Sequence, residues 1–149
     1  MKKIIYAIIF ILIVIQFIPV DRDNPPVTEE ITAPPIVLSI LKTSCYDCHS
    51  NETNWPWYSY IAPVSFLVAG DVKDGRKNLN FSEWDKYSTD KQIKLFEEMI
   101  EEVEKEDMPL PIYTYTHPNA KLDDHKIKLI KDWVKPGSSM QESLRYEKD

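Results

Sequence analysis

Both cysteines of this 149-residue chain lie in one short segment, Cys-Tyr-Asp-Cys-His, at residues 45–49. A C-x-x-C-H segment is the attachment signature of a c-type haem. The thiols of Cys45 and Cys48 can add across the two vinyl groups of the porphyrin, and the imidazole of His49 can bind the iron as proximal ligand. On a helix these three residues stand at i, i+3 and i+4, so all three project from one face. The segment therefore predicts one covalently attached haem c.

Two other kinds of site use the same residue types. A redox-active C-x-x-C pair usually opens a helix after a strand in a βαβ unit, and no strand pattern precedes Cys45. A zinc site would need a further ligand, such as His117 or His125, and neither stands at a familiar spacing. The residue pattern favours haem over both alternatives.

The sixth position of the iron has several candidate ligands in the chain. Met108 is favoured, because Pro109 and Pro111 keep its segment extended and stiff enough to hold a thioether across the open face of the haem. His117, which precedes a proline, is the alternative, and an open position is another. Three further candidates are expected elsewhere: Met99 in the core, His125 in the first turn of the last helix and Met140 in the C-terminal tail.

Helical spacing of apolar residues predicts the elements that position these groups. A first helix begins at Pro35 and leads into Cys45. A second runs from Pro63 to about Gly75, with an apolar face of Val64, Leu67, Val68 and Val72. A third starts at the capping box of residues 89–92, and a fourth runs from about Asp123 to a stop at Pro136-Gly137. No segment alternates in polarity as a strand does, so an all-α domain around one haem is expected.

Aromatic residues are dense just after the cysteine segment. Trp55 and Trp57, with two tyrosines beside them, are expected to cover the ring and exclude water, which would tune the redox potential. Plain core packing is the alternative. Core positions are predicted for Trp84, Tyr87 and Trp133. Either of two cations, Arg76 and Lys77, could pair with haem propionates, although a solvated helix end is favoured.

The N-terminus predicts export. Lys2 and Lys3 precede an apolar run from Ile4 to Ile18, and residues 1–20 are expected to form a signal anchor or transmembrane helix. No small-x-small cleavage site follows, so an uncleaved anchor in the bacterial inner membrane is favoured over a cleaved signal and a soluble periplasmic protein. The haem domain would face the periplasm or another extracytoplasmic space. We expect a proline-rich linker at 21–35, the haem-binding domain at 36–136 and a polar tail at 137–149.

The formal net charge of −6 makes nucleic acid an unexpected partner. Acidic side chains crowd residues 97–107, just before Met108. Such a run is usually a solvated face, but it could also dock a basic redox partner protein and raise encounter rates at low salt.

Three stretches of the chain resemble the small haem-binding domain family related to class I cytochromes c. They are CYDCHSNETNWPWYSYIAPVSFLVAGDV, DGRKNLNFSEW and DMPLPIYTYTHPNAKLDDHKIKLIKDWV, within about residues 36–135. The resemblance implies a cytochrome c-like helical domain with covalent haem at Cys45 and Cys48. It also implies His49 as proximal and Met108 as distal ligand, but it names no physiological role.

Three functions are compatible with this pattern. A membrane-tethered monohaem electron carrier is favoured, because two axial protein ligands leave electron transfer as the chemistry of the iron. A haem-based sensor would need Met108 to be displaced by a small gas. A peroxidase-type enzyme would need an open site with a distal acid–base group, for which His117 is the obvious candidate.

Overall fold

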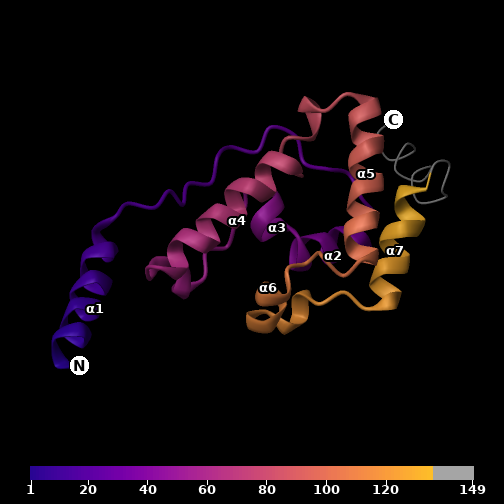
Figure 1. Ribbon diagram of the computed structural model, residues 1–149. Coiled ribbons are helices and arrows are strands. Elements are labelled where there is room, and N and C mark those ends of the chain that lie inside the picture. Colours follow the sequence, from indigo (N-terminus) through magenta and orange to yellow (C-terminus); the bar gives the residue numbers. More distant parts are fainter. Residues whose placement is uncertain (136–149) are drawn as a thin grey trace.

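The computed structural model describes residues 1–135, and every regular element in that range is helical (Figure 1). The α-helices are α1 (Lys2–Val14), α2 (Pro35–Ser44), α3 (Tyr46–His49), α4 (Val64–Asn78), α5 (Thr89–Glu104), α6 (Pro111–Thr116) and α7 (Asp124–Val134). Short 3-10 helices occur at η1 (Ile15–Phe17), η2 (Trp57–Tyr60), η3 (Trp84–Lys86) and η4 (Pro118–Ala120). The predicted all-α class is confirmed for these residues. The expected polar tail and Met140 lie outside the described part of the chain.

The starts of the main helices follow local sequence rules. Pro35 is the first residue of α2, a position where its missing N–H costs no hydrogen bond. Helix α5 is capped by Ser88, one residue earlier than the predicted capping box, since the Ser88 hydroxyl accepts the Lys91 N–H. Helix α7 is capped by Asp123, whose carboxylate accepts the Lys126 N–H at 2.8 Å.

The hydrophobic core lies where α2, α3, α5 and α7 meet (Figure 1). Trp133 from α7 is 2% exposed, as expected for a core residue, and its ring meets Phe96 edge-on at 5.1 Å. The fully or nearly fully buried members of this cluster are Ile31, Ala33, Val37, Ile40, Leu41, Tyr46, Phe81, Met99, Ile130 and Trp133. The packing brings the residues just before Cys45 against the helices that follow it much later in the sequence.

Helix α4 does not bury the apolar face that its sequence predicts. Val72 is 3% exposed, but Leu67 is 68% exposed and Val64 is 40% exposed. The buried residues of α4 are Ser65, Val72 and Gly75, so small side chains form the packed face. The prediction was wrong because α4 packs at close range on α3. A methyl group at Gly75 would lie 2.4 Å from the Cys48 carbonyl oxygen, which is too close for any larger residue without movement.

The proline-rich segment, residues 21–35, is extended but it is not detached from the domain. Ile31 is 3% exposed and its N–H donates to the Phe81 carbonyl at 2.8 Å. An isolated β-bridge joins Glu29 to Glu83. Because prolines leave such a segment with few internal hydrogen bonds, its polar backbone groups are satisfied by residues 81–84 instead. The folded unit therefore extends N-terminally beyond the predicted start at residue 36.

Helix α1 projects beyond the rest of the molecule (Figure 1). All residues of α1 are exposed, although most are large and apolar. Gln16, just after α1, exchanges two hydrogen bonds of 3.0 Å with the backbone of Ala62. Within residues 1–135, no helix combines the length and apolar character that crossing a membrane requires, so the expected spanning anchor is not supported.

Candidate functional site

The cysteine segment forms a single helical turn at the junction of α2 and α3. Cys45 breaks the continuity between the two helices with φ −127° and ψ −34°. Its carbonyl accepts hydrogen bonds from the N–H groups of Cys48 at 3.1 Å and His49 at 2.9 Å. The predicted i, i+3, i+4 arrangement is therefore present. Gly75 of α4 packs against this turn, close to the backbone carbonyl of Cys48.

Two cavities that share residues flank this turn. The larger has a volume of about 650 Å³, within the usual range for small-molecule and cofactor sites. The smaller has a volume of about 180 Å³. Their shared lining residues are Ser44, Cys45, His49, Asn78, Met108 and Pro109. A thiol, the imidazole and a thioether thus border both cavities.

Backbone geometry fixes the hydrogen on the His49 ring. Nδ1 lies 3.0 Å from the carbonyl oxygen of Leu79. A carbonyl can only accept, so Nδ1 carries the hydrogen and Nε2 keeps its lone pair. Burial lowers the pKa of His49, which favours the neutral ring. A neutral imidazole with its orientation held by a backbone carbonyl is the form that binds a metal.

The two thiols sit in an environment that suppresses their ionisation. Burial raises the pKa of Cys45 to about 12, with a further contribution from Cys48. Burial also raises the pKa of Cys48 to about 12, assisted by the negative charges of Asp47 and Asp71. Both residues are therefore thiols at neutral pH, a form that is slow to oxidise.

Met108 is brought to the same cavities as Cys45 and His49. Its loop leaves α5 with the N–H groups of Asp107 and Met108 both donating to the Glu102 carbonyl, at 3.0 and 3.2 Å. Met99 belongs to the hydrophobic core, as predicted, and also lines the larger cavity. Met108, which the neighbouring prolines favoured, therefore lies on a loop at the edge of both cavities.

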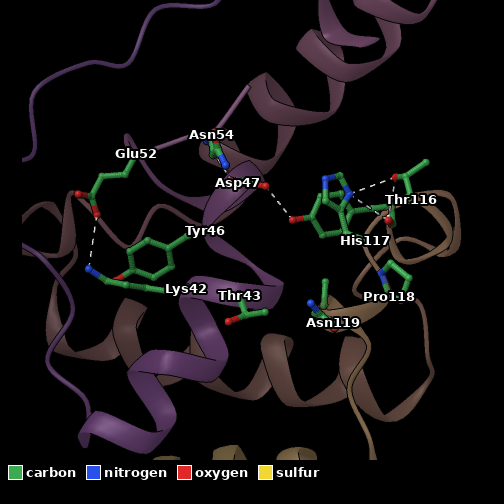
Figure 2. A pocket seen from close by; sticks show the side chains of 12 residues that line it. Lys42, Thr43, Tyr46, Asp47, Glu52, Asn54, Thr116, His117, Pro118 and Asn119 are labelled. Atoms are coloured by element: carbon green, nitrogen blue, oxygen red, sulfur yellow. Dashed lines mark hydrogen bonds and ion pairs between the residues drawn. The ribbon is translucent and has the colours of Figure 1, made fainter. Parts of the chain in front are cut away.

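The other candidate ligands lie elsewhere. His117 lines a separate, shallower cavity of about 560 Å³ and neither cavity beside Cys45 (Figure 2). Its ring stacks on Tyr113 with centroids 4.3 Å apart. His125 is exposed in the first turn of α7. Neither histidine is thus placed to complete a zinc site at the cysteines or to act on the far side of a bound ring.

Trp55 and Trp57 line neither of the cavities beside Cys45, contrary to the expected aromatic cover. Trp57 is 75% exposed. The expectation fails because η2 turns this cluster toward the start of α4 instead of the α2–α3 junction. The aromatic side chains that do line the cavities are Phe81, Tyr87 and Tyr113.

The two candidate cations at the end of α4 have different roles. The guanidinium of Arg76 donates to the carbonyls of Ser50 and Asp23 and to the side chains of Asn24 and Thr53, all within 2.9 Å. Arg76 is half-buried, ties the proline-rich segment to the domain and lines neither of the cavities beside Cys45. Lys77 does line the larger cavity.

The lining of the larger cavity fits a haem. Its walls combine the imidazole and thioether, which are common axial ligands, with a thiol and with apolar side chains from α5 and from residues 79–81. The buried hydroxyl of Ser44, which borders both cavities, has no hydrogen-bond partner in the described residues. A polar atom left without a partner at a cavity wall is expected where a further group belongs.

Three residues of this site escaped the sequence analysis. Leu79 acts through its backbone carbonyl, which leaves no side-chain signal in the sequence. Gly75 acts through the absence of a side chain at a tertiary contact. Tyr113 lies five residues after Met108 and lines the smaller cavity, and its place in the proline-flanked segment was the one available hint.

The fold is all-α, and two adjoining cavities are together bordered by two thiols, an imidazole and a thioether, which is the set of groups that suits a haem. A family model described as the haem-binding domain matches residues 10–136. The chain therefore belongs to the haem-binding domain family. Comparison with curated proteins and with solved structures finds no match. The family match begins well before residue 36, in agreement with the packing of the proline-rich segment on the domain.

Proposed function

We propose that this protein carries one haem c and works as a monohaem electron carrier. The observation that supports this most strongly is that Cys45, His49 and Met108 border the same cavities, although Met108 is about sixty residues distant in sequence. Cys48 joins them in the smaller cavity. This set supplies two attachment points and two axial ligands, which is the full requirement of a six-coordinate c-type site.

Attachment through the cysteines needs no outside oxidant or reductant. Each thiol would add across one vinyl group of the haem, with the sulfur joined to one vinyl carbon, the thiol hydrogen on the other, and the vinyl double bond converted to a single bond. Because the pKa of both thiols is raised by burial, few thiolates are present at neutral pH. Cys45 lines both cavities, and Cys48 lines the smaller one beside it.

His49 and Met108 would hold the iron from opposite sides. The haem, when bound, supplies one-electron exchange at iron, and a His/Met ligand pair raises its potential. The Leu79 carbonyl keeps the His49 ring in one tautomer and orientation, so His49 would be pre-oriented as a ligand. Apolar side chains such as Leu95 and Phe81 keep water from the ring.

A sensor with a displaceable methionine is the second candidate, because Met108 lies on a loop instead of within a helix. A peroxidase is less well supported, since its expected distal residue, His117, faces another cavity. We propose a basic protein as the redox partner, recognised by the acidic residues of 97–107. We also propose that the apolar N-terminus directs export to an extracytoplasmic space, where haem c is attached.

The proposal is tested on the full chain expressed with a c-type haem assembly system. Haem should stay with the polypeptide through acid–acetone extraction and denaturing electrophoresis, and Cys48→Ala should keep at most one thioether and lower the yield. Ferrous protein should bind carbon monoxide slowly or not at all. Extractable haem would refute covalent attachment, and rapid carbon monoxide binding would replace the carrier with a sensor or a peroxidase.

A further inference from the structure

Tyr113 links the Met108 loop to the cysteine segment. The loop leads directly into α6, and the Tyr113 hydroxyl on α6 donates to Asp47 Oδ2 at 2.7 Å (Figure 2). Asp47 lies between the two cysteines. Among the described residues, this is the one side-chain to side-chain hydrogen bond between residues 108–116 and residues 45–49. We refer to it as the Tyr113–Asp47 bond.

Asp47 is held in place by its own neighbours. Its second carboxylate oxygen, Oδ1, accepts the Asn54 N–H at 3.0 Å. Its backbone carbonyl accepts the Thr53 hydroxyl at 2.7 Å. The carboxylate is therefore directed at Tyr113 by contacts that do not involve Tyr113.

Tyr113 is held in the same way. Its ring stacks on His117 at an interplanar angle of 23°. Nδ1 of His117 in turn lies 3.1 Å from the Thr116 hydroxyl (Figure 2). It also lies 3.5 Å from the Tyr58 hydroxyl. Burial, with help from Asp47, raises the pKa of Tyr113, so the phenol keeps its hydrogen and remains a donor.

Both ends of the Met108 loop are thus fixed. On one side, the Glu102 carbonyl accepts two loop N–H groups. On the other side, the Tyr113–Asp47 bond fastens the start of α6 to the residues that bear the proximal ligand. The Tyr113 ring also lines the smaller cavity together with Cys48 and Met108. Release of Met108 from iron would require the loop to move away from one of these two points.

We propose that Tyr113 and Asp47 are positioning residues that keep the Met108 loop closed over the haem motif, and that their hydrogen bond sets how readily Met108 leaves the iron. The inference rests on the proposed His49/Met108 ligation. It makes the choice between a carrier and a ligand-binding protein depend on one hydrogen bond outside the coordination sphere. Hydrogen bonds to charged groups are strong enough to shift such an opening equilibrium by roughly tenfold or more.

The test is Tyr113→Phe in the full haem-loaded chain, which keeps the stacked ring and removes the hydroxyl. Carbon monoxide binding to the ferrous protein and imidazole binding to the ferric protein should become roughly tenfold faster or tighter. The near-infrared sulfur-to-iron band should weaken at a lower temperature than in the wild type. Tyr115→Phe is the matched control, since Tyr115 lies on the same helix and is 84% exposed. It should behave as the wild type.

A double-mutant cycle separates the bond from a general loss of packing. Asp47→Ala should open the iron to a similar extent, and adding Tyr113→Phe to it should have no further effect. Asp47→Asn keeps an acceptor oxygen and should recover part of the wild-type behaviour.

Two outcomes overturn the inference in distinguishable ways. A wild-type protein without the near-infrared band refutes ligation by Met108 and the inference with it. A wild-type protein that has the band, together with an unchanged Tyr113→Phe variant or fully additive effects in the cycle, refutes the positioning role alone.

Discussion

The side chains of His49 and Met108 are held at the cavity by different kinds of contact. The His49 ring is oriented by a backbone carbonyl at 3.0 Å, so substitution of Leu79 would leave its orienting group in place. Within residues 1–135 no hydrogen bond orients the Met108 sulfur, so its position depends on the loop around it. The proposed proximal ligand is therefore oriented by the backbone, whereas the proposed distal ligand is placed by loop contacts that can be removed one at a time.

Met108→Ala tests the distal ligand directly. We expect loss of the near-infrared sulfur-to-iron band and rapid binding of cyanide and carbon monoxide. The potential should fall, because a thioether favours ferrous over ferric iron relative to water. The fold should survive, since the thioethers and His49 still hold the ring. Visible and near-infrared spectra with a redox titration measure all of these effects.

Met99→Leu is the control for that substitution. Met99 also lines the larger cavity but belongs to the core and is 8% exposed. A volume-conserving change there should cost less than about 1.5 kcal/mol of stability and leave the band unchanged. If Met99→Leu abolished the band and Met108→Ala did not, the two methionines would exchange roles.

The sequence was sufficient where the placement of residues depends on their neighbours along the chain. Cys45, Cys48 and His49 lie within one turn, and the prolines beside Met108 marked its loop. The misplacement of Trp55 and Trp57 has the opposite cause. The closeness of these aromatic residues to the cysteine segment in sequence does not determine the direction of the chain after that segment. At η2 the chain places them away from the cavity.

Among the elements, the contact of α3 with α4 does most to position the motif. The two helices approach so closely that the Cys48 carbonyl occupies the space of a Gly75 side chain. Amphipathic spacing predicted a packed face of large residues on α4, and the structure packs small ones. A sequence pattern shows which residues are apolar. It does not show that the backbone of α4 must approach the backbone of the short helix α3 closely.

Gly75→Ala should therefore move α4 off the motif. Alanine is the better helix former by about 1 kcal/mol, but its methyl group would lie 2.4 Å from a backbone oxygen that cannot rotate away. We expect a net destabilisation of about 1–3 kcal/mol, measured by denaturant unfolding, and a perturbed haem spectrum.

Gly70→Ala provides the matched control on the same helix. A methyl group at Gly70 would meet nothing within 4 Å. This change should be neutral or stabilising by about 0.5–1 kcal/mol. Equal effects of the two substitutions would show that the close approach at Gly75 does not matter.

At the scale of the whole molecule, a few residues join the proline-rich segment to the rest of the domain. Phe81 accepts the Ile31 N–H on its carbonyl oxygen, packs in the core and lines the larger cavity. Arg76 joins the segment to Ser50, directly after the motif. These links explain why the family match begins before the predicted domain, and they could not be predicted because they depend on contacts across about fifty residues of chain.

Because the hydrophobic core and the larger cavity share residues, a bound haem would be part of the core. Phe81 and Met99 contribute to the buried cluster and to the wall of a cavity of about 650 Å³. Without a ring these apolar side chains would border a partly open space that water can enter. The chain would have to collapse into that space or admit water beside its core, and either change weakens the packing of the buried cluster.

Cys45→Ala/Cys48→Ala should therefore yield a protein that is largely unfolded, provided that no haem is retained. We expect far-ultraviolet circular dichroism well below the wild-type helical signal and no cooperative thermal transition near the wild-type temperature. Cys48→Ala alone, which keeps one attachment point and His49, should lie between the two. A double variant that is haem-free and still melts cooperatively at the wild-type temperature would show that the helices close around an empty cavity. In that case the haem would contribute chemistry to this domain but not its stability.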